Sequence, residues 1–537
     1  MQQSIGKALA AATVFALLGA AAPAAAQGAK TLVFCSEGNP DDLSPALART
    51  NTSFDAVLPV FDTLVRFDPA QRGIVPGLAE SWTISPDGLV YTFKLRPDVR
   101  FHPTAGYTPK RTLTAEDVIF TFNRQWKTDH PFHKVGDKRY NYFNDLSMPA
   151  LLSSVEAVDD LTVRFTLNRP QAPFLADLSM TFTAITSAEY ADFLLKKGTP
   201  EKYDQAPVGT GAFQFVSYRK DTMIRYKAFP DHWGAKPALD NLVFSITPDA
   251  GVRLNKLQSG DCHVMPFPNL ADLPKIRADK SLKMIEQEGF NVSFLTFNVQ
   301  KKPFDDVRIR RAVSMAVDKK TMIEAIYGST GRVAKNPLPP TIWGYNDAIV
   351  DTPYDPEGAQ RLLAEAGFPE GFEAEMWYMP VARPYMANAK RAAEMMRSDL
   401  ARVGVRITLA TDDWSVYMKR MMAGEHQSGM IGWTGDNGDP DNFLYTLLSC
   451  DSARAGGFNM AKWCNPEFDA LIVKAKQVSD QGERTRLYYQ AQEVFKREAP
   501  WLTLAHSLVF MVMREEVQGY QMNPFGLHLF RTVDLKQ

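Results

Sequence analysis

The region between residues 372 and 443 limits the possible folds more than any other part of the sequence, because helical and extended patterns alternate there. The periodicities predict strands over residues 373–379, 405–410 and 429–433, separated by helices over residues 386–403 and 414–423. Gly404 follows the first helix as a typical C-terminal stop. Because such alternation places successive strands in parallel with helices on the faces of the sheet, we expect an α/β domain.

Open parallel sheets bind ligands in the crevice beyond the carboxyl ends of their strands. Two of the predicted loops leave that edge. The loop after the first strand contains Arg383 and Tyr385, and the loop after the last strand reads TGDNGDPD from Thr434 to Asp441. The same edge therefore presents a cation and an acidic, glycine-rich turn.

Each of these features also has a simpler interpretation. The acidic turn resembles a calcium loop, but Asn442 and Leu448 occupy the positions where an EF-hand needs glycine and glutamate. An ordinary solvated acidic loop is the more economical alternative. Arg383, which lies between Pro380 and Pro384, fits a surface charge on a rigid turn equally well.

Aromatic residues gather near the same edge, at Trp377, Tyr378, Trp414 and Trp433. Most buried aromatic side chains serve core packing. Trp433 is the best candidate for ligand contact, because the acidic loop begins there.

The rest of the chain is also mixed α and β. Alternating patterns predict strands over residues 90–95, 161–167 and 222–229, and Thr114 to Asp117 reads as a capping box that opens a helix. Farther on, we expect a helix over 305–327 capped by Asp305 or Asp306, a helix over 483–499 ended by Pro500, and a strand over 501–504.

The N-terminus has the features of a removable secretory signal. Lys7 is followed by an alanine-rich apolar run that ends in Ala24-Ala25-Ala26, a suitable cleavage site. No later stretch has about 18 uninterrupted apolar residues. We therefore expect a signal peptide over residues 1–26 and an exported, soluble mature protein.

Bulk composition excludes several classes of protein. About 510 residues would remain after cleavage, more than one core usually supports, so we expect two or three domains. A hydrophobic content of 45% excludes general disorder, and a net charge of -1 lacks the basic excess that nucleic acid or an anionic membrane surface would attract.

The four cysteines, Cys35, Cys262, Cys450 and Cys464, are expected to form disulfides, because an exported chain meets oxidising conditions. Three pairings are possible. Cys450 and Cys464 enclose a short loop, and Cys35 with Cys262 would then join the mature N-terminus to the middle of the chain. Cys35 follows Leu-Val-Phe, which disfavours a lipid anchor.

No motif points to catalysis, a metal or a cofactor. The eight histidines show no pair at metal-ligand spacing, and a nucleophile elbow and a Walker sequence are both missing. We expect a protein that is not an enzyme and carries no cofactor. An exported peptidase is the alternative from a different functional class.

Several motifs resemble the dipeptide-binding proteins of the peptide and nickel solute-binding family, family 5, over the whole mature chain. The marks are KTLVFCSEG from Lys30, PGLAESW from Pro76, LTAEDVIFTFNR from Leu113, VGTGAF from Val208, SITPDAGVRLNKLQSGDC from Ser245, DDVRIRRAVSMAVDKK from Asp305, MPVARPYMANAKR from Met379 and GWTGDNGDPDNF from Gly432. The last two look specific to the dipeptide branch, whereas PGLAESW belongs to the family in general.

The resemblance implies an α/β, two-lobed periplasmic binding protein fold of type II, with an extra domain inserted in a discontinuous first lobe. Carried onto this sequence, lobe one comprises residues 28–288 and 507–537, with the extra domain at about 62–208, and lobe two comprises residues 289–506. Crossings near 288 and 506 would form the hinge. The resemblance also implies the disulfides Cys35 with Cys262 and Cys450 with Cys464.

The resemblance further implies that Asp436 receives the ammonium group of a dipeptide and Arg383 its carboxylate. Tyr385, Trp433, Thr434 and Gly435 would be close neighbours. The segment from Arg49 through Thr50, Asn51 and Thr52 would face them from lobe one. The family often has small residues with glycine in that segment, so this chain departs from the pattern there.

The resulting hypothesis is a periplasmic, monomeric substrate-binding protein of an ABC importer that delivers dipeptides to a membrane permease served by a separate ATPase. Haem or a longer peptide is the alternative cargo for the same fold. A sensory role through a chemoreceptor is compatible with transport. Side-chain preference, affinity and the partner permease are not encoded in any motif.

Overall fold

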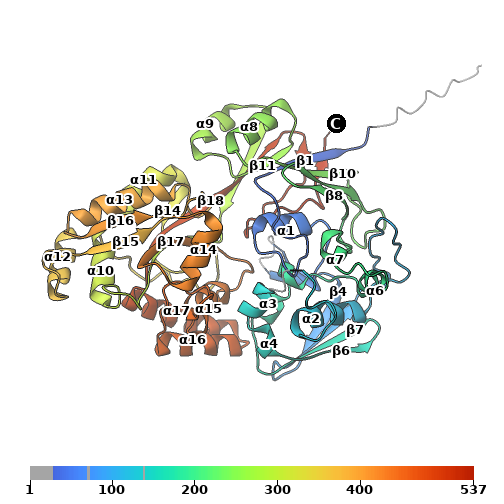
Figure 1. Cartoon of the computed structure of the whole chain (residues 1–537), viewed down its shortest axis with the longest axis horizontal. Helices are drawn as coiled ribbons and strands as arrows, with labels where there is room; N and C mark the ends of the chain where they lie inside the picture. Colours follow the sequence, from blue (N-terminus) through green and yellow to red (C-terminus); the bar gives the residue numbers. More distant parts are fainter. Residues whose placement is uncertain (1–27, 69–72, 137–139, 537) are drawn as a thin grey trace, which may run out of the picture.

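The computed structural model describes residues 28–68, 73–136 and 140–536 (Figure 1). The expected signal peptide, residues 1–26, lies outside the described residues. In Figure 1 one α/β body lies on the left and a second, larger one on the right, with β18 passing between them. Among the described residues, no helix combines the length and the apolar character needed to cross a membrane.

Twelve strands of the described chain form one sheet that runs through both bodies. Their order is β16-β15-β17-β13-β18-β11-β1-β10-β9-β8, and β12 and β14 pair with β18 as well. The strands are β1 Thr31–Ser36, β8 Phe213–Arg219, β9 Met223–Ala228, β10 Asn241–Ile246, β11 Val264–Pro266, β12 Leu282–Glu288, β13 Asn291–Phe297, β14 Gly331–Val333, β15 Glu373–Trp377, β16 Arg406–Ala410, β17 Ser428–Thr434 and β18 Trp501–Arg514.

The left body contains the alternating region, and its parallel strands are confirmed: β15 pairs in parallel with both β16 and β17. Its helices are α10 Val307–Ala316, α11 Lys319–Tyr327, α12 Pro356–Glu365, α13 Ala389–Ala401, α14 Trp414–Ala423, α15 Asp441–Leu448, α16 Pro466–Gln477 and α17 Gln481–Glu498. One continuous apolar core, from Phe290 to Phe525, packs these helices against the sheet.

Two predictions in this body were wrong in extent. The single helix expected over 305–327 is two helices, because Val317 is extended and the Asp318 side chain accepts a hydrogen bond from the Thr321 amide to begin α11. Asp306 caps α10. The strand expected over 501–504 is the much longer β18, whose apolar run continues through both bodies.

The right body has a second sheet of its own, in the order β4-β5-β7-β6. The Thr114 capping box is present and opens the helix that covers this sheet. A separate apolar core spans Ala46 to Val208. The elements are β4 Ala79–Ile84, β5 Val90–Leu95, β6 Leu152–Asp159, β7 Thr162–Leu167, α2 Ala115–Trp126, α3 Asn141–Asp145, α4 Met148–Leu151, α5 Phe174–Asp177, α6 Ala188–Lys196 and α7 Lys202–Gln205.

Shorter elements complete the described chain. They are α1 Asn51–Val57, α8 Ala250–Ser259, α9 Leu273–Ala278, the paired strands β2 Val65–Asp68 and β3 Gly73–Pro76, the paired strands β19 Val517–Gln518 and β20 Asp534–Leu535, and the 3-10 turns η1 Thr181–Thr183, η2 Leu270–Asp272, η3 Gly328–Thr330 and η4 Asp451–Ala453.

The chain passes between the two bodies at two adjacent points. β18 pairs with β13 up to Ala505 and with β12 from Leu508 onward. Between these ladders the buried Asn291 side chain donates to the Ser507 carbonyl at 3.1 Å and accepts from its amide at 2.9 Å. A side chain thus replaces part of the backbone ladder where residues near 288 and 506 meet.

Two disulfides join the four cysteines in the pairs that the resemblance implies. Cys35 bonds to Cys262 across 227 residues, and Cys450 bonds to Cys464 across 14. The first ties β1 to the chain just before β11, and the second closes the segment after α15. Cross-links of this kind stabilise the fold mainly by restricting the unfolded chain.

Candidate ligand-binding site

Two loops at the carboxyl ends of parallel strands carry the charged residues that the sequence singles out. β15 lies between β16 and β17, so the loops after β15 and β17 leave the same edge of the sheet as neighbours. Tyr385 joins them, because its ring lies against Gly432 of β17. A Cβ at Gly432 would lie 2.3 Å from Tyr385 Cδ2, so only glycine permits this contact.

The loop after β17 is held in place by Asn442, near the start of α15. The Asn442 side-chain oxygen accepts from the Asp436 amide and from the Trp433 indole, each at 2.9 Å. Its amide nitrogen donates to Asp436 Oδ2 at 3.2 Å. Asn442 therefore fixes the Asp436 carboxylate relative to Trp433.

The Asp436 carboxylate has neutral partners only. Tyr142 of α3 donates to Oδ1 at 3.4 Å, and Asn442 donates to the other oxygen. Within the described chain no lysine, arginine or histidine forms an ion pair with it. Burial raises the pKa of Asp436 to about 7, against the lowering effect of the two hydrogen bonds. This half-buried carboxylate lacks a cation.

The other acidic residues of this loop are committed to internal partners. Asp439 accepts two hydrogen bonds of 2.8 Å from Arg484, and Asp441 lies 3.6 Å from Lys476. All four side chains are buried. The solvated-loop interpretation is therefore wrong for this segment, since the helices α16 and α17 cover it. Asp436 is the carboxylate left for another role.

Arg383 lies at the start of a tight turn. Its amide donates to the Met386 carbonyl at 3.0 Å, and the Met386 amide donates back at 2.8 Å. The Tyr327 and Ser507 hydroxyls donate to the Tyr385 and Pro384 carbonyls, each at 2.6 Å. The turn is thus pinned to α11 and to the crossing point in β18.

The Arg383 guanidinium is half-buried and lies over an aromatic ring. Its Cζ is 4.8 Å from the centroid of the Trp414 ring, a cation–π arrangement. Among the described residues no carboxylate forms an ion pair with it. A surface charge on a rigid turn does not explain why Arg383 lies on the loop next to the one that carries Asp436, which also has no ion-pair partner among the described residues.

Trp433, Thr434 and Gly435 connect β17 to Asp436. The Trp433 ring is half-buried and meets Phe458 edge to face, with centroids 5.1 Å apart. Thr434 pairs with Asn291, and the Gly435 amide donates to Phe290 at 2.7 Å. A Cβ at Gly435 would lie 2.7 Å from the Phe443 ring, so this position also requires glycine.

Thr50, Asn51 and Thr52 lie at the N-terminus of α1 in the right body. Thr50 caps the helix and donates to Asp41 at 2.9 Å, and Thr52 donates to Glu37 at 2.5 Å. Asn51 donates to the Phe525 carbonyl at 3.2 Å. Of the three, Asn51 is brought to the same cavity as Asp436.

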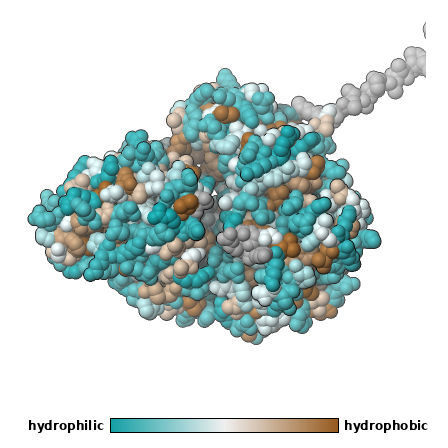
Figure 2. All heavy atoms as spheres, in the orientation of Figure 1, coloured by the Kyte–Doolittle hydropathy of each residue, from teal (hydrophilic) through white to brown (hydrophobic). Residues whose placement is uncertain are grey.

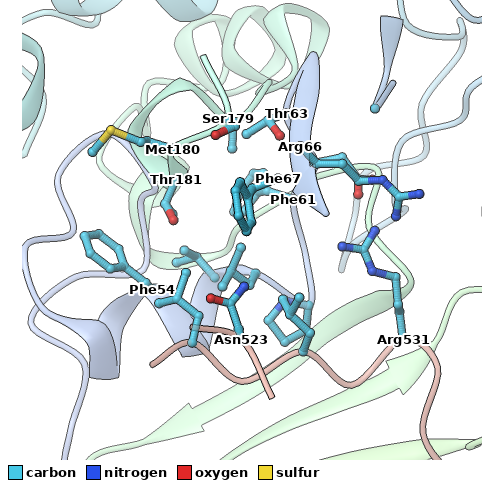
Figure 3. Close-up of a pocket in the computed structure, with 18 of the residues that line it drawn as sticks. Phe54, Phe61, Thr63, Arg66, Phe67, Ser179, Met180, Thr181, Asn523 and Arg531 are labelled. Atoms are coloured by element: carbon cyan, nitrogen blue, oxygen red, sulfur yellow. The ribbon is translucent and has the colours of Figure 1, made fainter. Parts of the chain in front are cut away.

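That cavity, of about 100 Å³, extends from Asp436 into the right body (Figure 3). Its walls include Asn51, Phe54, Tyr142, Met180 and Asn523. Arg383, Tyr385, Trp433, Thr434, Gly435, Thr50 and Thr52 do not line it.

Sequence reasoning missed Tyr142 and Asn523. Tyr142 lies in a five-residue helix without periodicity. The turn sequence Asn523-Pro-Phe-Gly526 was the one available signal for the C-terminal segment, and Gly526 there has φ 71°.

The bodies touch around this cavity through several polar contacts. Asn437 donates to Asp177 at 3.0 Å, Arg454 donates to Asp145 at 3.1 Å, and the Ala172 amide donates to Lys476 at 2.6 Å. Together with Tyr142 and Asp436, these contacts all join residues 140–180 of the right body to the left body. The face in Figure 2 is mainly hydrophilic, with hydrophobic residues scattered among polar ones.

The described residues contain no group of three histidine, cysteine or acidic side chains placed to hold a metal ion. The arrangement that they do contain is an unpaired carboxylate and an unpaired guanidinium on neighbouring loops. Such a pair is suited to a small molecule with opposite charges at its ends.

Comparison with known proteins gives consistent matches over most of the chain. The model of the bacterial extracellular solute-binding proteins, family 5 Middle, matches residues 73–455. The dipeptide-binding protein of Escherichia coli (strain K12) is 51% identical over 514 residues, which cover 96% of each chain. Heme-binding protein A of Haemophilus influenzae is 49% identical and covers 94% of this chain, with 92% of its own length matched. The structure of a dipeptide-binding protein from Pseudoalteromonas sp. SM9913 in complex with Met-Leu has a TM-score of 0.88 at 35% identity, covering 94% of this chain and 100% of that one.

Proposed function

Because this chain belongs to family 5 of the bacterial extracellular solute-binding proteins, we propose that it captures dipeptides between its two lobes for import. One observation carries this proposal: Asp436 lacks a cation and Arg383 lacks an anion, on loops that leave the same sheet edge. The peptide ammonium would pair with Asp436, and the peptide carboxylate with Arg383. The ligand supplies the two counterions that the described residues do not.

Fixed charges at both ends would select ligands by length. Consecutive Cα atoms lie about 3.8 Å apart, so one added residue misplaces one terminal charge. A charge-assisted hydrogen bond contributes about 1.5–3 kcal/mol, and a buried charge left unpaired costs more than the lost bond. Tyr385, Trp433, Thr434, Gly435, Thr50, Asn51 and Thr52 remain proposed neighbours of the ligand.

Ligand capture would stabilise the closed arrangement of the lobes. We place lobe one at residues 28–288 and 507–537, with the extra domain near 62–208, and lobe two at 289–506. Asn291 and Ser507 then lie at the hinge, where a side chain interrupts the ladder. A ligand shifts the closed population only by its differential affinity, so contacts from both lobes are required. Tyr142, from the proposed lobe one, and Asp436, from the proposed lobe two, lie together at the site and could both contact the ligand.

The closed form would be recognised by a membrane permease, with ATP hydrolysis in a separate subunit. Export through a signal peptide over residues 1–26 would place the monomeric protein in the periplasm. No catalytic step is assigned to this chain.

The test is calorimetry with Ala-Ala, N-acetyl-Ala-Ala and Ala-Ala amide. Wild-type protein should bind Ala-Ala at least about 30-fold more tightly than either blocked form. Asp436→Asn should lose the discrimination against acetylation alone, and Arg383→Met the discrimination against amidation alone. Asp347→Asn, at an exposed carboxylate paired with Lys335, is the control. Equal binding of free and blocked peptides by the wild-type protein would refute the proposal.

Haem is a second candidate cargo, because a haem-binding relative is nearly as similar to this chain as the dipeptide-binding one. Haem carries carboxylates but no ammonium group, so it leaves Asp436 without a partner. A Soret band in the purified protein, unaffected by excess Ala-Ala, would favour haem. Mass spectrometry of the ligand carried through purification separates dipeptides, longer peptides and haem.

A further inference from the structure

The cavity that Asp436 lines is also lined by two arginines, Arg66 and Arg531. Arg66 comes from β2, and Arg531 comes from the C-terminal segment before β20. Figure 3 shows the two guanidinium groups reaching toward one another on one side of the pocket, with Phe67 nearer its middle. Residues far apart in the sequence thus bring two positive charges to one place.

Neither guanidinium forms an ion pair with a carboxylate of the described residues. In the part of the chain that the structure describes, neither forms a side-chain hydrogen bond, and the buried Arg66 Nε has no acceptor. Burial lowers the pKa of Arg531, and the Arg66 charge lowers it further. Two like charges held together in a half-buried place are costly unless an anion binds between them.

One carboxylate, Asp62, lines the same cavity, and its charge favours protonated Arg531. Asp62 Oδ2 is already engaged, since it accepts from Thr210 at 3.0 Å and from the Trp233 indole at 2.9 Å. Two guanidinium groups against one carboxylate leave a net positive charge on this side. His528, which also lines the cavity, is neutral, because burial lowers its pKa to about 3.

The cavity therefore has opposite charges at its two ends. Asp436 accepts from Tyr142, whose ring packs against Phe54, and Figure 3 shows Phe54 on the side of the pocket opposite Arg66 and Arg531. The walls are largely apolar, including Phe54, Phe61, Phe67 and Phe525. At about 100 Å³ it has room for several waters, and hence for the heavy atoms of a glutamate side chain. Such a shape fits a short chain that carries an ammonium group at one end and an anion at the other.

We propose that Arg66 and Arg531 form an anion subsite that receives the side-chain carboxylate of an acidic first residue in the bound dipeptide. The inference rests on the proposed function, which places the peptide ammonium at Asp436. The ammonium and the first side chain share one Cα, so that side chain is the one that begins beside Asp436. Arg383 does not line the cavity, so the second residue points elsewhere.

The experiment compares dipeptides by calorimetry: Glu-Ala, Asp-Ala, Gln-Ala, Ala-Glu and Ala-Ala. In wild-type protein Glu-Ala or Asp-Ala should bind about tenfold or more tightly than Gln-Ala. The double variant Arg66→Met with Arg531→Met should lose that preference while binding Ala-Ala within about threefold of wild type. The affinity for Ala-Glu should be the same in the wild-type protein and in the double variant.

Arg100→Met, at an exposed arginine paired with Asp231, is the matched control and should keep the preference. Equal binding of Glu-Ala, Asp-Ala and Gln-Ala by wild-type protein would overturn the subsite while leaving dipeptide capture intact. A preference for Glu-Ala or Asp-Ala over Gln-Ala that persists in the double variant would overturn the subsite as well. Failure of the wild-type protein to bind any of the five peptides would instead overturn the proposed function. If the double variant does not fold, the wild-type comparison still decides.

Discussion

One short loop after β17 contains two kinds of carboxylate. Asp439 is buried and bonded twice to Arg484, with a second buried ion pair beside it between Asp441 and Lys476. Asp436 lies three positions earlier in the same acidic sequence but has neutral partners only, Asn442 and Tyr142. Residue type therefore does not assign the role. The counterion distinguishes them: Asp439 has one and holds the loop, whereas Asp436 has none among the described residues and is the carboxylate that we propose for the ligand.

The largest effect should come from breaking the structural pair. Arg484→Met leaves Asp439 buried without a cation, which costs about 3–5 kcal/mol of unfolding free energy. Urea denaturation of the ligand-free protein at pH 8 measures this. Arg332→Met, at an exposed pair with Glu288, is the control and should cost about 1 kcal/mol or less. A loss for Arg484→Met no larger than that of the control would remove the distinction between the two carboxylates.

At Asp436, in contrast, we expect a substitution to increase the unfolding free energy. Its folded pKa of about 7 lies above the ordinary value of 3.8, so folding becomes less favourable as pH rises through the interval between them. At pH 8 the ionised group therefore destabilises the ligand-free protein. Asp436→Asn should raise the unfolding free energy by about 1–3 kcal/mol, a range reduced to allow for residual solvent screening. The gain should disappear at pH 4, and a loss of stability at pH 8 would contradict the assignment.

Ligand binding should depend on pH through the same group. Only the ionised Asp436 attracts an ammonium group, and its pKa is about 7 without ligand. The affinity for Ala-Ala should fall by about tenfold from pH 7.5 to pH 6, while the peptide ammonium stays largely protonated. Calorimetry at both values tests this. The residual binding of Asp436→Asn should be nearly flat over the range, and an equally steep fall in that variant would assign the titration to another group.

The sequence predicted the parts of this site that depend on local pattern. The alternation of strands and helices was sufficient to place Arg383 and Asp436 on loops at one sheet edge, since parallel strands end together. The break between α10 and α11 was missed, because Asp318 interrupts an apolar stripe that otherwise continues. The Asp318 cap begins a new helix there, although the apolar periodicity continues across it.

Long-range partners could not be predicted in this way. Arg484 is 45 residues from Asp439, and Tyr142 is 294 residues from Asp436, so no spacing rule connects them. Spacing alone left the acidic residues of the loop equivalent, and only the family resemblance singled out Asp436. Spacing does not connect Arg66 and Arg531 either, which the fold brings together from β2 and the C-terminal segment. Which carboxylate has a counterion can therefore be known only once the folded structure shows which residues lie next to it.

The smallest predicted effect concerns the hydrogen bond from Tyr142 of the right body to Asp436 of the left body. Tyr142→Phe removes the hydroxyl that donates to Asp436 but keeps a ring that packs against Phe54 and Phe182. Because that hydrogen bond favours the ionised carboxylate, its loss should raise the pKa of Asp436 further. The affinity for Ala-Ala at pH 6 should drop about threefold, with a smaller change at pH 7.5, as calorimetry would show. The pH midpoint should move upward; a downward movement would mean that Tyr142 opposes the charge on Asp436 instead of supporting it.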